Sequence, residues 1–139
     1  MNGGAMNLTP APSTIILHHG TTLHRAQRII ANGPDAYYVE PGGVRRWDEP
    51  GFSARRVDIK TDALATPQEY ARLKAKNFPH EGGPVILEME VPVDVIAVLE
   101  TDPLAKFAMD SGDACFDPQV GMNELLAAWP TIVKRVIAL

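Results

Sequence analysis

The sequence has a single cysteine, Cys115, so no disulfide can form within the chain and a zinc site built on several thiolates is excluded. No uninterrupted apolar run is longer than that at residues 95–99, which is far shorter than the ~20 apolar residues that cross a bilayer. Thirteen Lys and Arg residues are outnumbered by seventeen Asp and Glu residues, which gives a net charge of -4. Proteins that coat nucleic acids usually carry a basic excess, so that class is disfavoured.

The length and composition fit one folded domain. The chain has 139 residues, of which 45% are hydrophobic and 22% are charged. A chain of this length buries roughly two-thirds of the surface that it exposes when unfolded, so it needs no disulfide or metal to fold. We expect a flexible leader over residues 1–13 and a single domain over residues 14–139. The leader lacks the basic and apolar regions of a secretory signal, which favours a cytoplasmic protein.

Charge is distributed unevenly along the chain. Residues 1–56 contain six arginines and four acids, a balance of +2, whereas residues 57–139 contain seven bases and thirteen acids, a balance of -6. The first part could therefore build a local anion site on an acidic body, since such a field raises the association rate of a charged ligand. Chance scatter of the charges is the alternative.

Two main helices are predicted from their capping residues. The first covers residues 23–32, where apolar side chains recur at helical spacing directly after Thr21 and Thr22, either of which can act as N-cap. The second begins at residues 66–69, which read Thr-Pro-Gln-Glu and form a capping box with proline at the first helical position. It should run to about Asn77.

The other elements are short. Apolar or alternating runs predict strands at residues 14–17, 37–39, 51–54, 85–91, 95–99 and 131–137, a loop at 40–50 and a short helix at 101–108, while 122–129 is ambiguous. This order lacks the strict alternation of a doubly wound α/β fold. We therefore predict an α+β fold, with a mostly antiparallel and possibly split sheet and two main helices.

The most informative motif is His18-His19-Gly20-Thr21, which lies where the first strand runs into the first helix. A glycine there lets a ligand approach the backbone closely, the N–H groups of a helix start can bind an anion, and a histidine can hydrogen-bond a ribose hydroxyl. Adjacent side chains on a strand point to opposite faces, so only one of the two histidines should face a cleft. A polar turn with a structural histidine is the alternative.

Three further sets of residues are candidates for a site, each with an ordinary structural alternative. The run Gly-Phe-Ser at residues 51–53 could bring a hydroxyl to a cleft, or could be a buried ring beside a surface serine. Glu124 could be an active-site carboxylate, or an acid that complements a helix dipole. An aromatic set could stack on a planar ring or could pack in the core, and its members are Tyr37, Tyr38 and Trp47.

Metal and acyl-transfer chemistry fit the sequence poorly. The histidines at the start of the domain have no acidic or thiolate partner at ligand spacing, so we expect no metal. Ser53 and His19 could be combined into a triad, but no nucleophile elbow is present. Cys115 has an aspartate two residues away on each side, and their charge should raise the pKa of its thiol and disfavour a nucleophilic role.

Taken together, these motifs resemble the ADP-ribosyltransferase superfamily over most of the chain. Members often open with a strand that ends in His-Gly-Thr and continue into a helix with a small residue and an apolar pair, as residues 17–33 do here. Their second motif is a Gly-aromatic-Ser/Thr strand followed by a helix with spaced alanines, similar to residues 51–53 and 70–75. A third motif supplies a glutamate near the last strands, for which Glu124 is the best placed. The resemblance implies an ADP-ribosyltransferase-like fold.

The resemblance also implies a role for each candidate residue, with NAD as the substrate. His19 and Gly20 would bind the nicotinamide amide and a ribose, with Thr21 beside them. Ser53 would support the binding site. Glu124 would hydrogen-bond the nicotinamide ribose and stabilise the oxocarbenium-like transition state, because a carboxylate acts strongly on developing positive charge in a water-poor cleft. The implied stacking ring comes from Tyr37, Tyr38, Phe52 or Trp47, and the implied pyrophosphate contacts come from Arg45, Arg46, Arg55 or Arg56.

The implied function is that of a small cytoplasmic, toxin-like transferase without a metal and without membrane association. It would move ADP-ribose from NAD to an unknown acceptor, which could be a protein, a nucleic acid or a small molecule, and would release nicotinamide. An antitoxin-like protein is a possible partner. The alternatives are a catalytically degenerate module of the same fold that binds a nucleotide or a protein, and an unrelated α+β domain whose histidines are structural.

Overall fold

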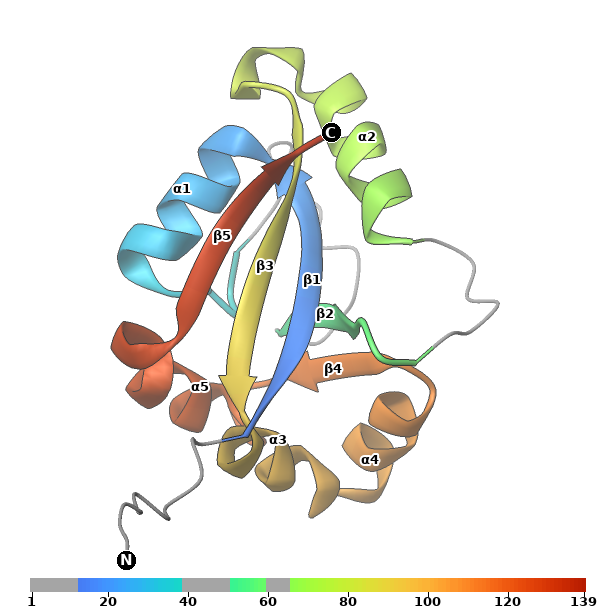
Figure 1. The fold of residues 1–139 in the computed structure, drawn as a ribbon, viewed down its shortest axis with the longest axis vertical. Helices are drawn as coiled ribbons and strands as arrows, with labels where there is room; N and C mark the ends of the chain where they lie inside the picture. The colour runs from blue at the N-terminus through green and yellow to red at the C-terminus, as the bar shows by residue number, and fades with distance from the viewer. Residues whose placement is uncertain (1–12, 39–50, 60–65) are drawn as a thin grey trace, which may run out of the picture.

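A single antiparallel sheet of five strands organises the described part of the chain, in the order β4-β2-β1-β3-β5 (Figure 1). The structure is a computed structural model that describes residues 13–38, 51–59 and 66–139. Helices accompany the sheet, which confirms the α+β class. In chain order the elements are β1 (Thr14–Thr22), α1 (Leu23–Asn32), β2 (Phe52–Arg56), α2 (Pro67–Asn77), a 3₁₀ turn (Pro79–Glu81), β3 (Pro84–Pro92), α3 (Val93–Glu100), α4 (Pro103–Asp110), β4 (Asp113–Phe116), α5 (Met122–Ala128), a second 3₁₀ turn (Trp129–Thr131) and β5 (Val133–Ala138).

The central strand β1 pairs unequally with its two neighbours. It pairs with β3 along its whole length, but with β2 only at Leu17 and His18. β2 and β4 pair with each other and run crosswise beside the lower part of β1 in the view of Figure 1. The sheet is thus one hydrogen-bonded unit in which β2 and β4 diverge from β1. On that side, no described strand pairs with the second half of β1, which carries His19 and Gly20.

Both predicted helix starts are confirmed. The hydroxyl of Thr22 accepts the N–H of Arg25 at 3.4 Å at the start of α1, and the hydroxyl of Thr66 accepts the N–H of Glu69 at 3.2 Å at the start of α2. Thr22 also donates to the carboxylate of Glu81 at 2.9 Å, and the Nε of Arg25 donates to the same oxygen at 2.7 Å. These contacts join the start of α1 to the turn before β3.

Gly20 satisfies a packing requirement between β1 and α2. A β-carbon at this position would lie 1.9 Å from the carbonyl oxygen of Pro67 and 3.1 Å from the backbone nitrogen of Ala71. The first turn of α2 therefore crosses β1 in direct contact with its backbone, and Ala71 is fully buried there. On this face of β1, the close approach that a glycine permits is made by α2.

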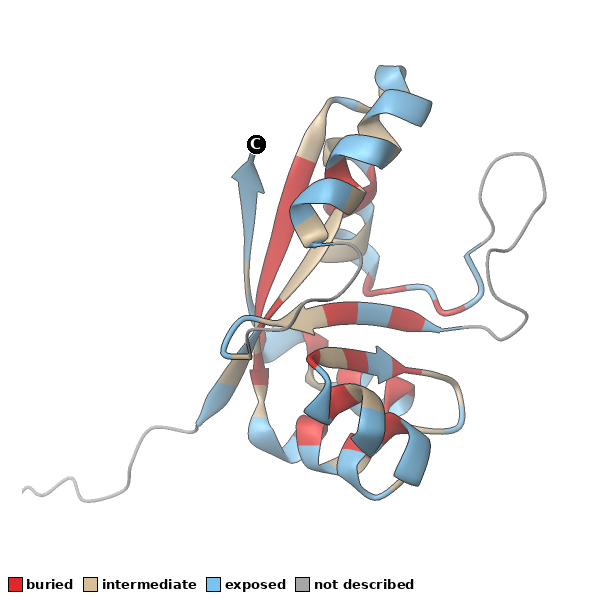
Figure 2. Cartoon of the chain, turned by 90° about the vertical axis from the view of Figure 1, so that its right-hand side faces the viewer, coloured by how far each residue is buried: buried red, intermediate tan, exposed pale blue. Residues whose placement is uncertain are grey.

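The core lies against the opposite face of the sheet. Leu17, Leu87 and Met89 occupy neighbouring positions on β1 and β3 and are fully buried. The helices α3, α4 and α5 gather at the lower end of the molecule in Figure 1 and close the core there with Leu99 and Leu125. Figure 2 shows that buried residues concentrate on the inner sides of these elements.

The strand predicted at residues 95–99 is wrong, because these residues form most of α3. Val95, Ile96 and Leu99 are buried whereas Ala97 is exposed, which is the spacing of a helix with one inner face. An apolar run of five residues does not distinguish a buried strand from a buried helix by its periodicity.

Other differences concern the number of helices and the positions of the strands. The described residues contain five α-helices where two main helices and a short one were expected. The short helix expected at 101–108 is confirmed as α4, and the ambiguous segment at 122–129 is helical over Met122–Ala128. The short strand β4 was not predicted. The strand predicted at 37–39 is absent at its first two positions, where Tyr37 lies in a turn, and Val39 lies outside the described residues.

A row of four charged side chains and one histidine crosses the outer face of the sheet, opposite the core. Its members lie at directly opposed positions of neighbouring strands, and in sheet order they are Asp113, Arg55, His18, Glu88 and Arg135. Arg55 donates to Asp113 at 3.0 Å, His18 Nε2 donates to Glu88 at 2.9 Å, and Arg135 donates to the same carboxylate. Hydrogen bonds from His18 and Arg135 hold the pKa of Glu88 below its ordinary value. We call these five residues the charged row.

The contact between α2 and β1 predicts the effect of Gly20→Ala. The added methyl group would overlap the backbone of Pro67, which cannot rotate away, so α2 must shift and stability should fall by ~3 kcal/mol or more. Urea unfolding followed by circular dichroism measures the change.

Gly83→Ala is the matched control. A β-carbon at Gly83 meets no atom within 4 Å, but its φ is +94°, so this variant incurs only backbone strain of about 1–2 kcal/mol. Equal losses in the two variants would show that α2 does not press on β1 as described.

Candidate functional site

His19 lies beside β2 where that strand leaves β1. Its Nδ1 is 2.7 Å from the carbonyl oxygen of Ser53, and because a carbonyl can only accept, Nδ1 carries the proton. The imidazole and the ring of Phe52 have centroids 4.5 Å apart and are tilted by 35°. His19 is half-buried, and its Nε2 has no hydrogen-bond partner among the described residues. The neighbouring His18 points to the opposite face and belongs to the charged row.

The environment of His19 keeps its imidazole neutral. Burial lowers its pKa to about 4, the hydrogen bond to Ser53 opposes the shift, and the positive charge of Lys74 adds to it. At neutral pH the ring therefore has a proton on Nδ1 and a lone pair on Nε2. Nε2 can accept a hydrogen bond from a ligand hydroxyl but cannot donate one.

Phe52 and Ser53 position His19 through different groups. Phe52 is 7% exposed and belongs to the core, so its ring supports the imidazole from within the protein. The side chain of Ser53 is exposed, while its backbone carbonyl accepts from His19. The contact that fixes the imidazole is therefore made by the backbone carbonyl of Ser53, and not by the Ser53 hydroxyl that was predicted to reach a cleft.

Gly20 and Thr21, the next two residues of the motif, are covered by other parts of the protein. Gly20 is covered on one face by the first turn of α2, and Thr21 is only 3% exposed. Of the motif on β1, His19 is therefore the residue with a polar atom best able to meet a ligand.

Tyr38 lies against α1. The guanidinium carbons of Arg25 and Arg28 are 5.3 and 5.6 Å from the centroid of its ring, within the range of a cation–π contact. Arg25 also lies 4.4 Å from the ring centroid of Phe78. The ring of Tyr38 therefore packs on two arginines, and among the described residues no contact joins it to His19.

Glu124 does not meet His19 in the described structure. It is exposed on α5, which lies at the lower end of the molecule in Figure 1, next to α3. His19 is in the second half of β1, where α2 packs. The expected pairing of an imidazole and a carboxylate across one crevice is not present among these residues.

The arginines of β2 already have carboxylate partners. Arg55 is bound to Asp113, and Arg56 donates through two nitrogens to the two oxygens of Asp58 at 3.0 and 2.8 Å. Both are thus neutralised within the protein rather than poised for a pyrophosphate. The other expected contacts, Arg45, Arg46 and Trp47, lie outside the described residues.

Cys115 lies opposite Ser53 on the neighbouring strand β4. Burial raises the pKa of its thiol, and the charges of Asp113 and Asp117 raise it further, as the sequence indicated. The thiol is therefore held in its less nucleophilic form. Over residues 13–38, 51–59 and 66–139, no three His, Cys, Asp or Glu side chains gather in a way that could hold a metal ion.

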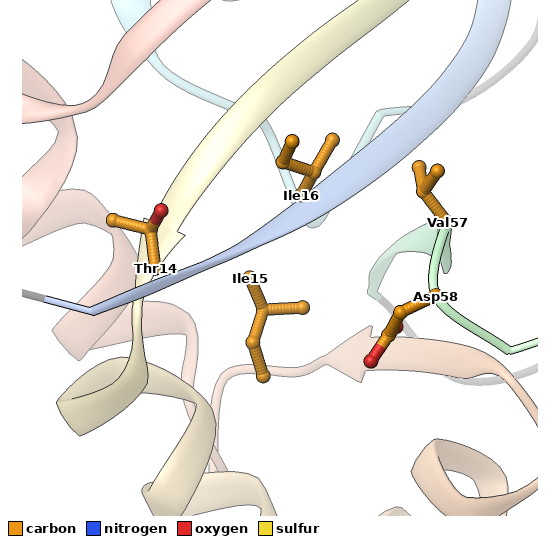
Figure 3. A pocket seen from close by; sticks show the side chains of 5 residues that line it. All are labelled: Thr14, Ile15, Ile16, Val57 and Asp58. Atoms are coloured by element: carbon orange, nitrogen blue, oxygen red, sulfur yellow. The ribbon is translucent and has the colours of Figure 1, made fainter.

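A hollow of about 260 Å³ lies at the start of β1, away from His19 (Figure 3). It is lined by Thr14, Ile15, Ile16, Val57 and Asp58. The carboxylate of Asp58 is engaged by Arg56, so the polar group of the lining is already paired. The hollow is mostly apolar and does not include any residue expected to bind NAD.

Lys74 is the residue of the site that sequence reasoning missed. Its charge acts on His19 because α2 packs on β1. The signal was present in Gly20, since a glycine inside a strand often marks a close approach of another backbone. That signal was read as room for a ligand instead.

Comparison of the chain with protein-family models, with curated proteins and with solved structures found no match in any of the three. In the described part of the chain, no helix has both the length and the apolar character needed to traverse a bilayer.

The geometry of His19 predicts its titration. We expect its ring to remain neutral, with the proton on Nδ1, until the pH falls to about 4. Because the folded state has the lower pKa, His19 stabilises the fold fully above 6.5, and this contribution is lost as the pH falls from 6.5 towards 4.

Nitrogen-15 NMR of the imidazoles as a function of pH measures both properties. A midpoint for His19 close to the ordinary value of 6.5 would contradict the burial described for its ring, and a proton on Nε2 would contradict the hydrogen bond from Nδ1 to Ser53.

Proposed function

We propose that this protein is an ADP-ribosyltransferase-like protein that takes NAD as its substrate at His19 and transfers ADP-ribose to an acceptor, with release of nicotinamide. The observation that carries the proposal is the fixed, neutral imidazole of His19, held by the carbonyl of Ser53 and backed by Phe52. The acceptor is a protein, a nucleic acid or a small molecule.

The chemistry of NAD fits a neutral histidine. The nicotinamide ring of NAD is cationic, and positive charge develops on the ribose as the glycosidic bond breaks. A protonated imidazole would repel both charges, whereas the neutral ring of His19 presents a lone pair on Nε2. That lone pair suits a ribose hydroxyl as hydrogen-bond donor, and a hydrogen bond of this kind is worth about 0.5–1.5 kcal/mol.

The placement of Glu124 favours a second candidate, a module of the same kind that binds a nucleotide or a protein without turnover. Transfer of ADP-ribose gains from a carboxylate near the developing positive charge. Glu124 is exposed on α5 at the lower end of the molecule, whereas His19 lies in the second half of β1. Binding and turnover must therefore be measured separately.

Calorimetric titration with NAD tests the binding step. We expect His19→Ala to weaken NAD binding by about tenfold, the loss of one hydrogen bond. His24→Ala, the same change at an exposed residue of α1, is the matched control and should bind as the unchanged protein does. Binding should also persist from pH 8 to pH 5 and weaken towards 4, as His19 gains a proton. Absence of binding at millimolar NAD would reject the transferase, and would leave the second candidate only as a module for a protein or for another nucleotide.

Chromatographic detection of nicotinamide tests the transfer step. Release by the unchanged protein, with loss of release but not of binding in Glu124→Gln, would support the transferase with Glu124 as its acid. NAD binding without release would support the module without turnover. Equal release by the unchanged protein and by Glu124→Gln would remove Glu124 from the mechanism.

A further inference from the structure

The outer face of α4 exposes two large apolar side chains next to each other. Leu104 and Phe107 are 82% and 73% exposed, more than any other large apolar residue in the described part of the chain. They are three residues apart on one helix and are therefore neighbours on its surface. An exposed apolar residue that stands alone is ordinary on a protein surface, whereas contiguous apolar surface marks an interaction site.

The packing of α4 within the protein does not account for these two residues. Its inner face is supplied by Ala105 and Met109, which are buried in the core. A helix with one buried face usually carries polar side chains on the opposite face. α4 has Leu104 and Phe107 there instead, so it is apolar on two faces, and the described residues cover only one of them.

The part of the fold that carries this apolar pair is strongly acidic. Residues 93–132, which form α3, α4, β4 and α5, contain seven acids and one base, a balance of -6. The rest of the chain has a balance of +2, because the whole chain has a net charge of -4. The three helices gather at the lower end of the molecule in Figure 1, so this charge is concentrated at one end of the fold. We call residues 93–132 the acidic lobe.

Most charges of the acidic lobe are not neutralised within the protein. Nζ of Lys106 donates to the carboxylate of Asp110 at 2.9 Å, and Arg55 donates to Asp113 at 3.0 Å. The pKa of Lys106 is raised by the hydrogen bond to Asp110 and also by the charge of Glu100, so Glu100 lies within electrostatic reach of α4. Five acids of the lobe form no ion pair among the described residues, and they are Asp94, Glu100, Asp102, Asp117 and Glu124.

The sign of this charge decides which kind of partner fits the apolar pair. Nucleic acids and anionic membrane surfaces would be repelled by the acidic lobe. A second copy that docked through the same face about a two-fold axis would oppose acidic surface to acidic surface. A basic partner, in contrast, would meet opposite charge around an apolar contact.

We propose that the outer face of α4 binds a basic amphipathic helix of another protein. Leu104 and Phe107 pack between apolar side chains of that helix, as the ridges of one helix fit the grooves of another. Lysines or arginines beside its apolar stripe meet Glu100 and the other acids of the lobe. The apolar pair anchors the partner, and the charges accelerate the encounter and exclude acidic partners. This inference does not rest on the proposed function, because α4 carries none of its residues.

A synthetic peptide tests the proposal. The probe is a fluorescein-labelled, amidated peptide of about 18 residues, long enough to form a helix, with Leu along one face and Lys on the others. We expect fluorescence anisotropy to give a dissociation constant in the micromolar range, about tenfold higher at about 500 mM salt than at about 50 mM, because salt screens exposed charges.

Two comparison peptides separate the contribution of charge from that of the apolar stripe. In one, every Lys is replaced by Glu, and in the other the same residues are reordered so that no helix face is apolar. Each should bind about tenfold more weakly than the probe. Binding as tight as that of the probe by either peptide would overturn the proposal.

Substitutions in the protein locate the binding face. Leu104→Ala and Phe107→Ala should each raise the dissociation constant of the probe by about tenfold, the loss of one anchor. Leu73→Ala is the matched control, since Leu73 is 50% exposed on α2, outside the acidic lobe, and this variant should bind as the unchanged protein does. Circular dichroism checks that all three variants are folded. Binding that withstands both changes on α4 would overturn the proposal.

Glu100→Gln tests the charge independently of the anchors. Removal of a charge at the rim of an interface acts mainly on association, so stopped-flow fluorescence should show about twofold slower association with the probe at low salt. Glu69→Gln is the matched control, since Glu69 is exposed on α2 and glutamine can replace it in a capping box. An equal effect of the two changes would overturn the assignment of the charge to the acidic lobe.

Other occupants of this face give different results. Self-association in sedimentation velocity that Phe107→Ala abolishes would assign the face to a second copy. Binding to phosphatidylserine vesicles or to duplex DNA that Phe107→Ala abolishes would assign it to a membrane or to a nucleic acid. Each of these results would overturn the proposal, as would absence of probe binding at about 1 mM peptide.

Discussion

The alternation of side chains along β1 is the constraint on which the rest of the structure depends. Two adjacent histidines on one strand must point to opposite faces. His18 is therefore drawn into the charged row by Glu88, while His19 is turned to the core side against Phe52. A change of one residue in the register of β1 would exchange these environments and bring the wrong histidine to Ser53. Full pairing with β3 prevents that change.

The divergence of β2 from β1 gives His19 its character. Because β2 pairs with β1 only at Leu17 and His18, the carbonyl of Ser53 is left to accept from an imidazole instead of from a β1 backbone group. α2 fills the opposite side of the strand at Gly20 and brings the charge of Lys74 within reach. The free carbonyl thus follows from the departure from regular pairing, and the charge of Lys74 follows from the packing of α2 on β1. Together they yield a neutral ring with one nitrogen fixed and the other available.

Local signals along the chain predicted the fold better than they predicted the site. The cap at Thr66 was identified correctly, and Thr22 was one of the two candidates for the other, because each cap depends on side-chain and backbone groups three residues apart. The strand expected at 95–99 was wrong because a buried apolar run has no polar positions to reveal its period. Glu124 was chosen by its position in the sequence alone, and no local signal states which end of the sheet a helix will cover. Contacts over a long sequence separation decided those cases.

Hydrogen bonds within the protein limit the chemistry that three of its carboxylates can perform. Glu81 is bound by Thr22 and Arg25, Glu88 by His18 and Arg135, and Asp58 by Arg56, and these hydrogen bonds lower the pKa of all three acids. An acid held in this way remains ionised, but its oxygens are already occupied by donors, so it has little capacity left to stabilise a new positive charge. The acids of the sheet therefore serve the fold. A reaction at His19 would need a carboxylate without such partners. Among the described residues Glu124 makes no ion pair, but it lies on α5. Under the proposed function, the separation of these two groups is therefore the feature that favours a binding module over a transferase.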